Sequence, residues 1–277
     1  MIAIGRSFGR ISSGLAISMA IALTAVSGVW AQNTAPSSES VLSAAFENRY
    51  AIDAISRVEL VIRNGSGEAI HRKVHYLTKI IDDRLHSIAR LTAPEYLRGM
   101  TILTIERRDR SHDAFAFVPA LGKTRRVTTA QKSDAFFGSD LTYEDLERKR
   151  TDEFELDELV VAEFGGEAIY RIGGALVSKG IYSRVEFDIA QSDHAILSTR
   201  YYKRGESDPY RVLETPRSSM VEREGHVLPT RLLVNNVRAD TSTEVLIADL
   251  QVNASIPDRI FTVATLEQQR KLPEPKP

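Results

Sequence analysis

Cysteine is missing from this chain, and aromatic residues are scarce. The 277 residues include no Cys, and Phe, Trp and Tyr together make up 7%. Without cysteine there are no disulfides and no reactive or metal-binding thiols, so apolar packing must hold the core. We also expect no lipid on an N-terminal cysteine of the kind that anchors bacterial lipoproteins.

An excess of positive charge is also missing. The formal net charge is −1, and removing residues 1–31, which hold Arg6, Arg10 and no acid, leaves −1 − 2 = −3. A nucleic-acid partner is therefore not expected, because a phosphate backbone requires a basic surface. A polybasic attachment to anionic lipid is excluded on the same ground.

Catalytic and metal-binding motifs are absent as well. No G-x-S-x-G nucleophile elbow and no phosphate-binding glycine loop occurs. Among the six histidines only His71 and His75 are close in sequence, and at i and i+4 of a strand they lie about 13 Å apart, too far to chelate one ion. We therefore expect no catalytic residue, no metal, no cofactor and no enzymatic activity.

The first 31 residues have the pattern of a cleaved signal peptide. Arg6 and Arg10 precede an uncharged, largely apolar run over 11–30, and Val29-Trp30-Ala31 places small residues at a cleavage site. The alternative is an N-terminal membrane anchor, since the run is long enough to span a bilayer. Cleavage would give an exported, soluble protein.

Hydrophobic periodicity over 32–270 indicates one mainly β domain with a helix in front. Residues 39–53 place Val41, Leu42, Ala45 and Phe46 on one helical face. About eleven to thirteen strands of alternating pattern follow, with connections too short for parallel crossovers. This predicts a single curved antiparallel sheet. A short helix is expected over 264–271 and a disordered tail, rich in proline, over 271–277.

Residues 119–146 interrupt the strand pattern and hold the candidate site. Arg125 and Arg126 are adjacent on a predicted strand, so at most one points inward. They are either two surface arginines, or one of them pairs with an acid of the following loop and fastens that loop over a cavity. The acids available for such a pair are Asp140, Glu144 and Asp145.

The same loop carries two adjacent aromatic residues among polar ones. Phe136 and Phe137 are unusual in a polar segment, and we expect them either to plug the open end of the sheet or to face a ligand. A short helix is expected within 141–149, with Thr142 as its N-cap. The candidate ligand or lid residues are Arg125, Arg126, Phe136, Phe137, Asp140, Tyr143 and Asp145.

Three segments carry a family resemblance: residues 92–99 (TAPEYLRG), 119–126 (PALGKTRR) and 136–146 (FFGSDLTYEDL). In this order they resemble the outer-membrane lipoprotein-sorting protein family related to the carrier LolA. The resemblance implies a periplasmic, incomplete β-barrel with a helix or loop lid and an apolar cavity for acyl chains. It also implies association with inner-membrane transporters of the resistance-nodulation-division (RND) type.

Two functions follow as hypotheses. The first is a periplasmic carrier that shuttles a lipid or the acyl chain of a lipoprotein toward the outer membrane. The alternative is a non-catalytic accessory or sensor module of an RND-type lipid transporter or of an envelope-stress pathway. The fold that the resemblance implies is shared by both, so it does not decide between them.

Overall fold

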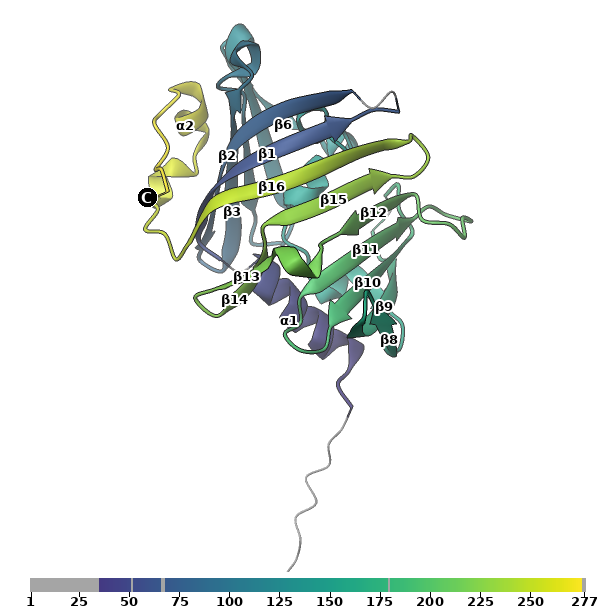
Figure 1. The fold of residues 1–277 in the computed structure, drawn as a ribbon. Helices are drawn as coiled ribbons and strands as arrows, with labels where there is room; N and C mark the ends of the chain where they lie inside the picture. Colours follow the sequence, from purple (N-terminus) through teal and green to yellow (C-terminus); the bar gives the residue numbers. More distant parts are fainter. Residues whose placement is uncertain (1–34, 51, 66–67, 179, 276–277) are drawn as a thin grey trace, which may run out of the picture. The chain divides into compact units, whose positions relative to one another are not determined.

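A long antiparallel sheet curves around an apolar interior in the computed structural model (Figure 1). The structure describes residues 35–50, 52–65, 68–178 and 180–275. The expected signal peptide, residues 1–31, lies outside them. The first half of the sheet consists of β1 (Ala54–Arg63), β2 (Ala69–Ile81), β3 (Arg84–Ala93), β4 (Thr101–Glu106), β5 (His112–Val118) and β6 (Lys123–Val127).

The second half of the chain supplies the remaining strands. They are β7 (Phe154–Leu156), β8 (Val160–Phe164), β9 (Glu167–Leu176), β10 (Arg184–Ala190), β11 (Ile196–Tyr202), β12 (Arg211–Glu214), β15 (Arg231–Asn236) and β16 (Thr241–Val252), with a separate hairpin of β13 (Met220–Arg223) and β14 (His226–Pro229). The order in the sheet is β6-β5-β4-β3-β2-β1-β16-β15-β12-β11-β10-β9-β7, and β8 also pairs with β9.

Neighbouring strands are antiparallel throughout, and the pairing of β1 with β16 joins the two halves. The sheet remains open between β6 and β7 in the described part of the chain, so the barrel is incomplete, as the family resemblance implies. These two edge strands are consecutive in sequence. Residues 128–153, hereafter the closing segment, connect them.

Alternation along the strands gives the sheet an inner and an outer face. The inner face carries Leu60, Ile102, Leu213 and Leu232, which belong to one apolar cluster with Phe136 of the closing segment. The closing segment therefore packs inside the curve of the sheet and fills part of it.

The predicted N-terminal helix is α1 (Ser38–Tyr50), which packs on the inner face of β9, β10 and β11. Phe46 of the helix meets Phe187 of β10 edge-on, with ring centroids 5.5 Å apart. The helix forms because its apolar residues repeat with a helical period, and it is held because that stripe is buried against the sheet.

The C-terminal segment covers part of the outer face. After β16 the chain passes through α2 (Val263–Glu267), which lies outside the curve of the sheet (Figure 1). Its Leu266 packs with Leu77 of β2 and Leu103 of β4. The tail expected to be disordered from residue 271 continues this packing, because Leu272 is only 4% exposed and Glu274 pairs with Arg57. That prediction is wrong for residues 271–275, since an apolar side chain between the prolines finds a buried place on the sheet.

Candidate functional site

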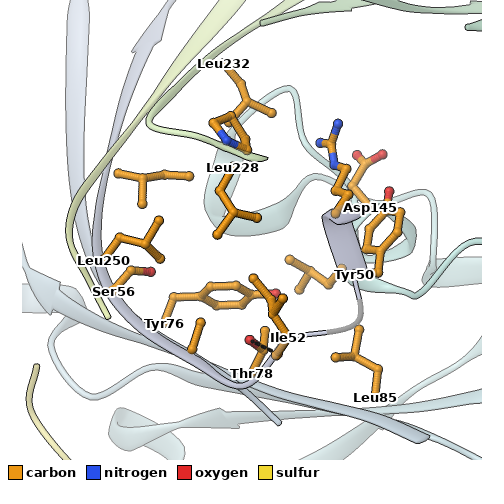
Figure 2. Close-up of a pocket in the computed structure, with 15 residues that line it drawn as sticks. Tyr50, Ile52, Ser56, Tyr76, Thr78, Leu85, Asp145, Leu228, Leu232 and Leu250 are labelled. Carbon is orange, nitrogen blue, oxygen red and sulfur yellow. Dashed lines mark hydrogen bonds between the residues drawn. The ribbon is translucent and has the colours of Figure 1, made fainter. Parts of the chain in front are cut away.

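An apolar cavity of about 180 Å³ lies on the inner face (Figure 2). The sheet, the C-terminal end of α1, the β13–β14 hairpin and the closing segment surround it. Its aliphatic lining includes Ile52, Ala54, Leu85, Leu228, Leu232 and Leu250. Aliphatic lining of this kind favours hydrocarbon over water.

A second, smaller cavity of about 60 Å³ adjoins the first. Both cavities are lined by Arg49, Tyr50 and Asp145, so these residues form the partition between them. The smaller cavity extends under α1 toward Phe154 and Phe187. A movement of the partition would join the two spaces.

The aromatic residues of the closing segment pack into the inner-face cluster. Phe136 is 3% exposed, and the ring of Phe137 lies against it with centroids 4.3 Å apart. Tyr143 meets Phe136 edge-on at 6.3 Å. In this structure Phe136 thus packs in the interior of the sheet.

A buried ion pair fastens the closing segment to the sheet. Arg211 of β12 donates two hydrogen bonds to the Asp145 carboxylate, both of 2.7 Å. The Arg211 side chain is 3% exposed, and its guanidinium lies 4.5 Å from the ring centroid of Tyr201. Burial alone would raise the pKa of Asp145, but the Arg211 cation lowers it, and the net pKa lies below the usual value.

Asp145 also organises the turn to which it belongs. Its carboxylate accepts hydrogen bonds from the backbone N–H and the hydroxyl of Thr142, at 2.7 and 3.0 Å. The predicted helix over 141–149 is reduced to a 3₁₀ turn, Tyr143–Leu146, that begins after Thr142. The N-cap prediction is therefore correct, while the helix itself is one turn long.

A second buried cluster holds the other end of the closing segment. Glu147 accepts from Lys132 at 2.6 Å and lies 3.5 Å from the Nδ1 atom of His112. Arg150 donates to Glu106 of β4 at 2.6 and 3.0 Å. Burial lowers the pKa of His112 to about 4, so the imidazole is neutral at pH 7. The segment is thus tied by ion pairs to β12 and to β4, and it contacts β5 through the neutral His112.

The expected pairing of Arg125 or Arg126 with an acid of the loop is wrong. The two arginines do lie on opposite faces of β6, but Arg126 bonds Asp113 on the outer face. Arg125 is exposed beside Tyr143, whose pKa is raised by burial, an effect that the Arg125 cation partly offsets. An edge strand leaves both side chains in water, so neither reaches the buried acids.

The other two acids of the loop also bond elsewhere. Asp140 accepts from the hydroxyl of Thr243 at 2.8 Å, and its backbone N–H donates to the same oxygen at 2.9 Å. Glu144 pairs with Lys149 at 3.2 Å. Sequence reasoning missed Arg211 altogether. The available signal was an arginine that alternates with Leu213 and so shares its buried face.

Across residues 35–50, 52–65, 68–178 and 180–275, no group of three or more His, Cys, Asp or Glu side chains is arranged to hold a metal ion. Over those same ranges, no helix has the length and apolar character needed to cross a membrane.

Comparison with known proteins places these features in a family and a fold. A family model with the description "-like: Uncharacterized protein" matches residues 83–268. No curated protein matches the chain. The family match covers β3 to α2 and therefore includes the closing segment and Arg211.

Solved structures share the fold. A domain assigned to outer membrane lipoprotein sorting from Vibrio parahaemolyticus is 18% identical, with a TM-score of 0.76 over 82% of this chain and 97% of that chain. A DUF1329 family protein from Desulfovibrio piger is 21% identical, with a TM-score of 0.72 over 77% and 91%. A LolA superfamily protein from Nitrosomonas europaea is 19% identical, with a TM-score of 0.65 over 82% and 98%. The fold is therefore LolA-like, as the sequence resemblance implied.

Proposed function

Since this chain belongs to the family whose model matches residues 83–268 and has the LolA-like fold, we propose that it is a carrier for an acyl chain. The cargo is a lipid or the lipid part of a lipoprotein, held on the inner face of the sheet. The observation that carries this proposal is the apolar cavity bounded by α1 and the closing segment (Figure 2).

Hydrophobic transfer provides the mechanism. An acyl chain in water is destabilised by about 0.8 kcal/mol per CH₂ group relative to an apolar site. The cavity of about 180 Å³ is smaller than the roughly 300–1,000 Å³ typical of ligand pockets. Cargo binding must therefore displace part of its wall, and the closing segment, which is joined to the sheet mainly by side chains, is the part that we propose moves.

The site of action that we propose is the periplasm. The signal-peptide pattern of residues 1–31 supports export, and an outer-membrane destination is supported by the lipoprotein-sorting domain with the same fold. We propose a non-catalytic site, because its charged groups Asp145, Arg211 and Lys149 are engaged in ion pairs. An inner-membrane RND-type transporter is the partner to seek by cross-linking.

A cavity-filling variant tests the carrier proposal. Ser56 is buried on the inner face of β1 and lines the cavity, so Ser56→Phe should place a ring where the chain would lie. We expect wild-type protein to bind a fluorescent fatty acid, and Ser56→Phe to weaken that binding by about tenfold or more.

The matched control is Ser207→Phe, in an exposed turn, which should bind like the wild type. Circular dichroism and thermal unfolding of each variant establish that it is folded, since overpacking can itself destabilise a core. Failure of the wild type to take up the fatty acid, or equal binding by all three proteins, would contradict the proposal.

A further inference from the structure

Four charged groups line the two cavities, and three of them are held in ion pairs. The larger cavity is lined by Arg49 and Asp145, and the smaller one adds Glu144 and Lys149. Asp145 is neutralised by Arg211, and Glu144 by Lys149. Arg49 is the charged lining group that remains, and it lies at the partition between the cavities.

Arg49 has no ionic or hydrogen-bonding partner among the described residues. It lies in the last turn of α1, is half-buried, and its guanidinium contacts the ring of Tyr50 with 5.7 Å to the centroid. Its charge acts at the cavity floor: burial raises the pKa of Tyr76 to about 12, and Arg49 partly opposes that rise. The cation therefore acts on a side chain of the cavity that it helps to line.

An unpaired cation in such a place is unfavourable. Removing a charged group from water costs several kcal/mol unless an opposite charge meets it. The C-terminal end of a helix favours a cation, which accounts for part of its stability there. It does not occupy the five N–H donors of the guanidinium, which stay available to a ligand.

We propose that Arg49 is the counter-ion for the head group of the cargo. The ligand is an amphiphile with an acidic head, a carboxylate or a phosphate, whose acyl chain occupies the cavity beside Ile52, Leu228 and Leu250. A guanidinium binds either acid through paired, charge-assisted hydrogen bonds. This inference rests on the proposed function, because it assigns the class of ligand for the same cavity.

Four amphiphiles of equal chain length test it. Dodecanoate, dodecyl phosphate, dodecanol and dodecylammonium are titrated into the protein by calorimetry below their aggregation limits. We expect the two acids to bind about tenfold or more tightly than dodecanol, as one charge-assisted hydrogen bond allows, and dodecylammonium to bind most weakly. The relative affinity of the two acids tells carboxylate from phosphate.

Variants assign the preference to Arg49. Arg49→Gln should lower the affinity for the acids to that for dodecanol and leave dodecanol itself unchanged, whereas Arg49→Lys should keep the preference. Arg63→Gln is the matched control, because Arg63 lies on the outer face of β1 and pairs with Glu244. It should behave like the wild type.

Two results overturn the inference in different ways. Equal binding of dodecanoate and dodecanol by the wild type, or an acid preference that survives in Arg49→Gln, refutes the role of Arg49 and leaves the carrier proposal standing. Absence of binding by all four compounds refutes both.

Discussion

At the scale of single residues, Arg211 shows what the sequence could and could not predict. Asp145 is one of the three acids that the sequence offers for fastening the closing segment, and its carboxylate does accept a hydrogen bond from an arginine, Arg211. Arg211 lies 66 residues further along the chain. Periodicity does not predict which side chains pair over such a separation. Alternation places a side chain on a face, but only the curvature of the sheet brings β12 under the closing segment.

Removing Arg211 should destabilise the protein strongly. Arg211→Met leaves the Asp145 carboxylate buried without its counter-ion, which typically lowers the free energy of unfolding by about 3–5 kcal/mol. Urea unfolding followed by circular dichroism measures the change. The double variant Arg211→Met, Asp145→Leu should recover most of the loss, and a double variant as unstable as Arg211→Met alone would show that the pair is not the cause.

His112 should make stability depend on pH. Its pKa is about 4 in the folded protein, lowered from 6.5 by burial. Between these values the unfolded chain binds a proton that the folded state does not, so the free energy of unfolding falls as the pH drops from 6.5 to 4. The loss is on the order of 3 kcal/mol.

The variant His112→Gln isolates this contribution. Glu147, whose pKa is raised by burial, acts in the opposite direction, because the folded state there binds the extra proton. Denaturant unfolding from pH 7 to 4 gives the free energy of unfolding of wild type and variant. Glu147 is present in both proteins, so the difference between the two free energies should show the contribution of His112. Identical slopes in the two proteins would refute it.

At the scale of elements, periodic segments were predictable and the closing segment was not. The apolar stripe of α1 is buried as its period predicts, and so is the apolar face of β10, formed by Val185, Phe187 and Ile189. The closing segment has no period, because its 3₁₀ turns are fixed by contacts with distant strands. Phe136 could be recognised as out of place in a polar loop, but not assigned its position in the core.

Locking the closing segment should slow exchange of cargo. Asp140 and Thr243 meet at 2.8 Å through their side chains, and the chain has no cysteine, so Asp140→Cys with Thr243→Cys introduces one defined disulfide. Oxidised protein should exchange a fluorescent fatty acid about tenfold or more slowly than reduced protein. Stopped-flow measurement with and without reductant gives both rates.

The single variant Thr243→Cys is the control for that experiment, and its rate should not respond to reductant. If the oxidised double variant exchanges cargo as fast as the reduced one, the closing segment is not the part that moves.

At the scale of the whole molecule, the fold class was predictable, but the strand pairing that joins the two halves of the sheet was not. Short connections establish antiparallel neighbours, yet the pairing of β1 with β16 joins segments nearly 200 residues apart. That pairing makes one curved sheet out of two halves and leaves its edges at β6 and β7. The closing segment can bridge these edges because the chain passes directly from one to the other.

The central claim is that the inner-face cavity carries an acyl chain. Native mass spectrometry of the protein, purified without detergent from the envelope of its own cells, tests this most directly. We predict a species heavier than the polypeptide by the mass of an acidic lipid, and loss of that species in Ser56→Phe. A wild-type protein found only at the mass of its bare polypeptide would contradict the account.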